Sequence, residues 1–181
     1  MASLVEALVG AGLRVARFEF PYMTARRVGA RRPPDREPVL RSTWHAVVRE
    51  LSPGTSPARL AIGGKSMGGR IATIVADELE VAAVVCFGYP FHPPKAPTKL
   101  RVAHLEHLRT RTLIVQGERD PFGDRAEVAG YPLSSAIELA WCPDGDHALR
   151  PRRRSGHTEA TNLALAAARV VAFLERPCAT G

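Results

Sequence analysis

Apolar residues along the chain fall into two patterns, short continuous runs and longer stretches with helical spacing. The short runs end at or just before Gly or Pro, and they predict strands over residues 13–20, 59–63, 81–88, 112–116 and 137–142. Residues 81–88 are apolar at nearly every position, which is typical of a strand covered on both faces. The longer stretches predict helices over residues 3–9, 39–51, 67–79 and 158–174, with another helix start at Asp124.

Strands that alternate with helices indicate an α/β fold with a parallel, doubly wound sheet and helices on both faces. Two stretches interrupt the alternation: residues 26–36 carry five arginines, and residues 89–97 are rich in proline. Both are predicted to be loops. We find no internal repeat, and 181 residues suit one domain, so we expect a single domain over residues 1–181.

The composition indicates the cellular compartment of the protein but says little about its function. The net charge of +7 comes almost entirely from arginine. Cys86, Cys142 and Cys178 are scattered and form no Cys-x-x-Cys pair, which excludes a zinc ribbon and favours a reducing compartment. The N-terminus lacks the pattern of a secretory signal, and no apolar run approaches the roughly 18 residues of a membrane span. We therefore expect a cytoplasmic protein without membrane contact.

The strongest chemical signal is Gly-Lys-Ser-Met-Gly at residues 64–68, directly after a predicted strand and before a predicted helix. This context is typical of a nucleophile elbow, a tight turn that displays Ser66, and the Met67 N–H is then placed to bind an oxyanion. A phosphate-binding loop would need glycine where Arg59 stands, so we reject it. A tight turn with a chance serine remains the alternative for the motif alone.

A nucleophilic serine needs a base and an acid that orients the base. Asp120 follows the strand predicted at 112–116, and His147 follows the strand predicted at 137–142, so both should lie at the same sheet edge as Ser66. We therefore predict Ser66, Asp120 and His147 as catalytic residues. The competing candidates are less well placed: they are the histidines His45, His92, His104, His107 and His157 and the acids Glu118, Asp124, Asp144 and Asp146. His104 and His107 have the spacing of a metal pair, but a solvated helix face is the preferred interpretation, and no metal or other cofactor is expected.

Five segments together carry a resemblance to a known family: residues 17–23, 63–70, 88–94, 116–123 and 144–147. They resemble bacterial α/β-hydrolase-like proteins grouped with the testis-expressed protein thirty and the third subunit of the non-specific-lethal complex, which are related more distantly to dienelactone hydrolases. The resemblance covers nearly the whole chain. It implies an α/β-hydrolase fold with Ser66, Asp120 and His147 as the triad.

The chain departs from that group at its start. Such proteins usually begin with an additional strand and a His-Gly-Ala-Gly-type turn that supplies the second oxyanion donor. Here Met1 falls just ahead of the first helix, so we expect this central strand to be missing. We hypothesise that the sequence is a fragment or a shortened gene model whose true start lies upstream. The loss would leave residues 13–20 and 59–63 with unpaired inner edges or force them to pair directly.

Three functions follow as hypotheses. The first is a serine hydrolase that acts on an ester or related acyl bond of a small substrate. Tyr22, Tyr89, Phe91 and His92 are candidates for its substrate pocket, with loop packing as the equal alternative. The second is a non-catalytic interaction domain. The third, nucleic-acid binding through residues 26–36 and 150–154, is not favoured, because neither arginine cluster is interleaved with aromatic residues.

Overall fold

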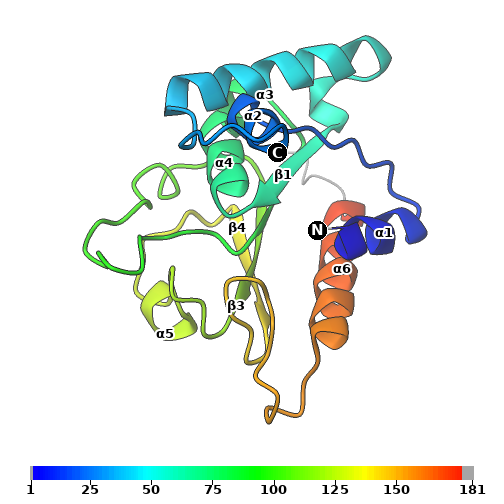
Figure 1. Ribbon diagram of the computed structural model, residues 1–181. Coiled ribbons are helices and arrows are strands. Elements are labelled where there is room, and N and C mark those ends of the chain that lie inside the picture. Colours follow the sequence, from blue (N-terminus) through cyan, green and yellow to red (C-terminus); the bar gives the residue numbers. More distant parts are fainter. Residues whose placement is uncertain (1, 177–181) are drawn as a thin grey trace.

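A four-stranded parallel sheet forms the centre of the computed structural model, which describes residues 2–176 (Figure 1). Its strands are β1 (Ala61–Lys65), β2 (Ala83–Phe87), β3 (Thr112–Gly117) and β4 (Ile137–Cys142), and they lie in the order β1-β2-β3-β4. Four of the five predicted strands are thus confirmed, with β4 at the predicted bounds. Cys178 lies outside the described residues.

The register brings the carboxyl ends of the strands to one edge. Lys65 of β1 lies opposite Phe87 of β2, and Phe87 lies opposite Val115 of β3. Gly117 of β3 lies opposite Cys142 of β4. Residues that follow β1, β3 and β4 therefore emerge at the same edge of the sheet, where ligands bind in folds of this kind.

Helices α2 (Pro21–Arg27), α3 (Glu37–Leu51) and α4 (Met67–Leu79) lie on one side of the sheet (Figure 1). Leu40, Trp44 and Val48 recur every fourth residue along α3, so they share one face, and all three are buried. They belong to the same hydrophobic cluster as Val84 and Cys86 of β2. The apolar residues with helical spacing thus form the face of α3 that packs on the sheet.

Helices α1 (Ala2–Gly10) and α6 (Glu159–Glu175) cover the opposite face (Figure 1). The alternate residues of β2, Val85 among them, cluster with Leu4 of α1 and Val170 of α6. The N-cap of α6 is Thr158, whose hydroxyl accepts a hydrogen bond from the Thr161 N–H at 3.1 Å. The predicted two-sided sheet is confirmed.

Three short helical elements complete the order. The turns η1 (Ser52–Gly54) and η2 (Pro57–Arg59) connect α3 to β1, and α5 (Arg125–Val128) lies between β3 and β4. Asp124 caps α5: its carboxylate accepts from the Glu127 N–H at 2.9 Å, and Glu127 accepts from the Asp124 N–H at 3.0 Å. The predicted helix start at Asp124 is confirmed.

Residues 13–20 are not a strand, contrary to prediction. They run as an extended segment, and the sheet of the described residues contains only β1 to β4. An apolar segment forms a strand only where a neighbouring strand pairs with it through backbone hydrogen bonds. Here Phe18 instead packs edge-on against Trp44 of α3, with the ring centroids 4.7 Å apart.

Two further expectations are corrected. The start of the predicted arginine loop belongs to α2, where Pro21 in the first turn has its backbone angle already set for a helix. The segment with His104 and His107 is a series of turns rather than a helix face. Among residues 2–176, no helix combines the length and the apolar character needed to cross a membrane.

Candidate active site

Ser66 occupies a strained turn between β1 and α4. Its φ of 52° and ψ of −120° lie in a region that non-glycine residues rarely adopt, which costs about 1–3 kcal/mol. Its N–H donates to the Phe87 carbonyl at 2.9 Å, which ties the turn to β2. A Cβ on Gly64 would lie 2.9 Å from the Gly68 carbonyl carbon, and one on Gly69 would lie 2.7 Å from the Gly64 oxygen. The glycines therefore let β1 and α4 approach closely beneath the serine.

The structure brings Ser66, His147 and Asp120 into one chain of hydrogen bonds. His147 Nε2 lies 2.9 Å from Ser66 Oγ, and His147 Nδ1 lies 2.8 Å from Asp120 Oδ2. Asp120 is fully buried, whereas the His147 side chain retains 23% of its exposure. A buried carboxylate thus orients an imidazole whose far nitrogen faces a partly exposed hydroxyl, which is the arrangement needed to make that hydroxyl nucleophilic.

Asp120 and His147 lie in two loops, and hydrogen bonds from both backbone and side-chain atoms join these loops. The Arg119 N–H donates to the Gly145 oxygen at 2.9 Å, and Glu118 accepts from the Asp144 N–H at 3.0 Å. That bond lowers the pKa of the Glu118 carboxyl. Arg119 Nε also donates to Asp144 Oδ1 at 2.8 Å, and the hydrogen bond from Arg152 lowers the pKa of Asp144 to about 2. Charged contacts therefore reinforce the loop that ends in His147.

Sequence reasoning missed three residues that lie against Asp120 or His147. Gln116 donates to Asp120 Oδ2, and the Phe122 N–H donates to Asp120 Oδ1, both at 2.9 Å. The Phe122 ring packs on the His147 ring with centroids 4.2 Å apart. Gly88 has a φ of 62°, and a Cβ there would lie 2.8 Å from the His147 oxygen. The sequence offered one signal for these residues, which is their position along the chain. Gln116 and Phe122 stand within four residues of Asp120, and Gly88 ends a predicted strand.

The competing acids have other roles in the structure. Asp146 accepts from the Ala148 and Arg150 N–H groups and so stabilises its own turn. Asp124 caps α5, and Asp144 and Glu118 form the loop contacts described above. None of these four carboxylates is the His147 partner, because that position is taken by Asp120.

The histidine that contacts Ser66 Oγ is His147, and none of the competing histidines takes that position. His45 pairs with Glu78, and His92 Nε2 lies 3.4 Å from Glu127. His104 contacts the Thr73 hydroxyl at 2.9 Å, and burial together with the Arg70 guanidinium lowers its pKa to about 4. His107 is exposed. Within residues 2–176, no three metal-ligating side chains gather in one place, so no metal site is assigned.

Of the four candidate pocket residues, three are interior. Tyr89 and Phe91 are fully buried and His92 is 2% exposed, so in this structure they leave no surface for a substrate. Burial also raises the pKa of the Tyr89 phenol. Loop packing, the alternative for these residues, describes their position. Tyr22 is different: it is partly exposed and stacks on Phe20, whose ring lies beside Gly68 of the elbow.

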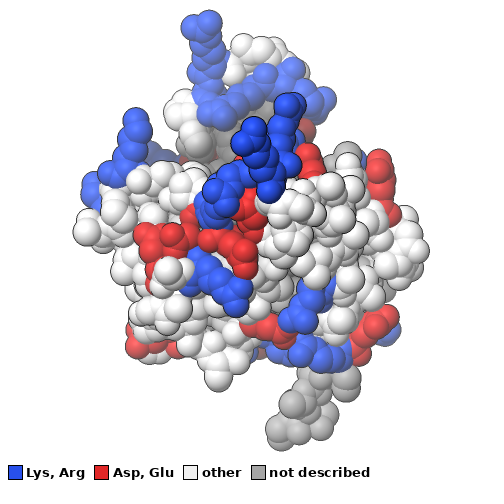
Figure 2. Space-filling model, turned by 90° about the horizontal axis from the view of Figure 1, so that it is seen from below, with Lys and Arg blue, Asp and Glu red and all other residues white. Residues whose placement is uncertain are grey.

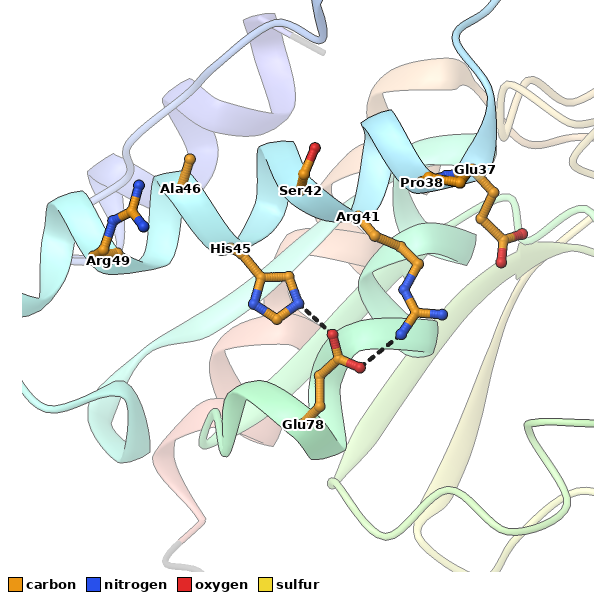
Figure 3. Close-up of a pocket in the computed structure, with 8 residues that line it drawn as sticks. All are labelled: Glu37, Pro38, Arg41, Ser42, His45, Ala46, Arg49 and Glu78. Atoms are coloured by element: carbon orange, nitrogen blue, oxygen red, sulfur yellow. Dashed lines mark hydrogen bonds and ion pairs between the residues drawn. The ribbon is translucent and has the colours of Figure 1, made fainter.

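A groove of about 640 Å³ lies elsewhere, along α3 (Figure 3). Figure 3 shows Glu78 of α4 between His45 and Arg41 of α3, with a hydrogen bond to His45 and an ion pair with Arg41. None of Ser66, His147 and Asp120 lines this groove. These polar side chains cross-link two helices, and we assign them no chemistry.

Basic side chains form several patches on the face seen from below in Figure 1, with acidic side chains beside them (Figure 2). In the 150–154 cluster, Arg152 pairs with Asp144 and Arg150 pairs with Glu159. The positive charge of the cluster is therefore partly neutralised within the chain.

Comparisons with known proteins agree with this architecture. Solved structures similar to this chain include an esterase domain from Rhodothermus marinus (18% identity, TM-score 0.55, 74% of this chain and 66% of that one). They also include an alpha-beta serine hydrolase homologue from Coxiella burnetii (18%, 0.58, 80% and 62%) and a putative hydrolase of the alpha/beta superfamily from Xanthomonas campestris (20%, 0.56, 94% and 88%). The chain spans less than two thirds of the first two proteins, and at these identities the likeness shows the fold alone.

The family comparison covers almost the entire sequence. Residues 1–175 match the family described as an alpha/beta hydrolase domain. The match includes Ser66 and the loops that contain Asp120 and His147. This chain therefore belongs to the alpha/beta hydrolase domain family.

Proposed function

We propose that this protein is a serine hydrolase that cleaves an ester or related acyl bond of a small substrate, with Ser66, His147 and Asp120 as its triad. The observation that carries the proposal is the unbroken hydrogen-bond chain from buried Asp120 through His147 to Ser66 Oγ. Membership of the hydrolase family and the fold shared with serine hydrolases support it. A scaffold would not require all three groups in this order.

Acylation uses the two nitrogens of His147 separately. Ser66 Oγ attacks the carbonyl carbon of the substrate, and its proton moves to His147 Nε2. The tetrahedral intermediate then collapses, the bond to the leaving group breaks, and Nε2 returns its proton to that group. Asp120 holds Nδ1–H throughout, so the imidazole keeps the tautomer in which Nε2 accepts a proton.

Deacylation repeats these steps with water as the nucleophile. Water attacks the acyl carbon of the Ser66 ester while His147 Nε2 takes its proton. Collapse releases the carboxylic acid, and Ser66 Oγ recovers its hydrogen from Nε2. Proton and acyl group balance over the cycle, and the products are an acid and an alcohol.

The oxyanion of both intermediates is assigned to the Met67 N–H. Met67 is the first residue of α4, and the first N–H groups of a helix have no partner within the helix. The positive end of the helix dipole adds to the attraction. Loss of one oxyanion donor costs about 10²–10³ in turnover, so this single N–H is a large part of the proposed rate enhancement.

Tyr22 and Phe122 are the proposed contacts for the acyl group. Tyr22 stacks on Phe20 beside the elbow, and Phe122 covers His147. Both are aromatic and partly exposed, which suits a small apolar acyl chain. Within the family, we place the chain in the group of the testis-expressed protein thirty on its five motif segments. Buried, unpaired Cys86 and Cys142 support a reducing, cytoplasmic setting.

Ester hydrolysis tests this function. Purified protein should release nitrophenol from p-nitrophenyl acetate, propionate and butyrate, and Ser66→Ala should abolish the release. Ser42→Ala is the matched control, because Ser42 is an exposed serine on α3. If the folded protein were no faster than Ser66→Ala with every ester, the proposal would fail in favour of a non-catalytic interaction domain.

A further inference from the structure

Gln116 is a long polar side chain in the interior of the sheet. All six residues of β3 are buried, and Gln116 is 0% exposed. Strand alternation puts Gln116 on the same face as Ile114, the face covered by α3 and α4. A primary amide in such a position is unfavourable unless its polar atoms are hydrogen-bonded, so its partners indicate what it holds in place.

The amide of Gln116 contacts three chain positions. Its Oε1 accepts from the Tyr89 N–H at 2.7 Å, and its Nε2 faces the Tyr89 oxygen at 3.1 Å. Nε2 also donates to Asp120 Oδ2 at 2.9 Å and faces the Gly123 oxygen at 3.1 Å. The orientation follows from these partners, because a flipped amide would set its nitrogen against the Tyr89 N–H and its oxygen against three acceptors.

The Gln116 amide binds the same oxygen of Asp120 that contacts His147. Asp120 Oδ2 is the oxygen that faces His147 Nδ1 at 2.8 Å, whereas Oδ1 accepts from the Phe122 N–H. We propose that Gln116 is a positioning residue, whose amide fixes the Asp120 carboxylate so that Oδ2 stays aligned with His147. The inference rests on the proposed function for its kinetic readout, but its geometry is independent of any reaction.

Removal of the amide would leave Asp120 Oδ2 without its second donor, so that His147 Nδ1 alone would hold this oxygen. The Phe122 N–H would still bind Oδ1, and the carboxylate could then turn about that bond. Oδ2 would move out of line with His147 Nδ1, which weakens the restraint on the imidazole ring and on its tautomer. Gln116 also binds the backbone of Tyr89, the residue after Gly88, and a Cβ added to Gly88 would lie 2.8 Å from the His147 oxygen. One amide therefore joins the two loops that flank the histidine.

Two variants separate positioning from simple packing. Gln116→Met keeps the length of the side chain and removes both polar atoms. Gln116→Glu keeps an oxygen for the Tyr89 N–H. Its second oxygen donates to Asp120 only when protonated, and when ionised it repels the Asp120 carboxylate. Thr112→Val is the matched control, because Thr112 is a fully buried polar residue at the other end of β3 whose hydroxyl bonds the Thr110 oxygen.

The experiment combines two measurements on the full chain. One is the rate at which Ser66 reacts with a fluorophosphonate probe, as a function of pH. The other is the proton NMR signal of the hydrogen between His147 Nδ1 and Asp120, assigned by its loss in His147→Gln. Near-ultraviolet circular dichroism at each pH establishes that the variant is folded.

We expect Gln116→Met to react roughly 10- to 100-fold more slowly, the range for losing one hydrogen bond to a charged group. Its downfield signal should shift or disappear, while Thr112→Val keeps both the rate and the signal. For Gln116→Glu, the rate relative to the unmodified protein should fall as pH rises, because ionisation removes the donor and adds a like charge.

The inference is overturned if folded Gln116→Met keeps the original rate and the original signal. If Gln116→Met does not fold, a rate ratio for Gln116→Glu that is constant with pH overturns it instead. If the unmodified protein does not react with the probe, the proposed function fails, and the NMR signal of the variants alone decides the role of Gln116.

Discussion

Gly88→Ala is a sharp test of how closely the fold holds His147. Gly88 follows β2 with a φ of 62°, and an added Cβ would lie 2.8 Å from the His147 oxygen and 3.2 Å from His147 Nδ1. Two effects follow. A left-handed backbone costs alanine about 1–2 kcal/mol, and the methyl group has to push the histidine backbone away by about half an ångström.

These effects can be separated with a second glycine. Gly12 has a φ of 88° and nothing within 4 Å of its added Cβ, so Gly12→Ala carries the backbone strain without the contact. For a chain of this size, about 1–2 kcal/mol lowers the melting temperature by roughly 2–8 °C, and we expect at least this loss in both variants. Only Gly88→Ala moves His147 relative to Ser66. A displacement of about 1 Å can cost roughly 10²-fold, so we expect a loss of roughly 10- to 100-fold in Ser66 reactivity.

The assay is the second-order rate of reaction with a fluorophosphonate, measured at a temperature where both variants are folded by circular dichroism. The reasoning is refuted if Gly88→Ala and Gly12→Ala react at the same rate. It is also refuted if the two lose reactivity in parallel with their melting temperatures, because the effect would then be one of stability alone.

Three further outcomes are expected. Because burial and Arg70 hold the pKa of His104 at about 4, below its ordinary 6.5, the unfolded chain takes up the proton first, and stability falls as pH drops from about 6.5 towards 4. His104→Gln should flatten this loss in urea unfolding at pH 7 and pH 4.5, and an equal loss in both proteins would count against the assignment. Arg119→Ala removes a contact to Asp144 in the histidine loop and should slow probe labelling several-fold. Arg125→Ala, at a more exposed ion pair, should leave the labelling rate unchanged, and equal effects of the two would contradict the loop argument.

Much of the site was predictable because its residues follow predicted strands at recognisable positions in the sequence. Glycines around Ser66 indicate a tight turn, and Asp120 and His147 each follow an apolar run that becomes a strand. In a parallel sheet all such positions lie at one edge, so the order of the elements is enough to bring the three residues together.

The parts that were not predictable depend on tertiary partners. Residues 13–20 have the composition of a strand, but a strand exists only with a neighbour to pair with. Tyr89 and Phe91 are in a proline-rich loop, yet the loop folds inward and buries them completely. The hydrophobic pattern could not reveal the role of Gln116, because its partners Tyr89 and Asp120 lie in loops that follow two different strands.

The central claim is that Ser66 is an activated nucleophile, and intact-mass analysis after treatment with a fluorophosphonate tests it most directly. The account predicts one adduct on the unmodified protein, none on folded Ser66→Ala, and a full adduct on the control Ser42→Ala. An unmodified mass for the folded parent protein would contradict the claim, and so would an adduct that persists in Ser66→Ala.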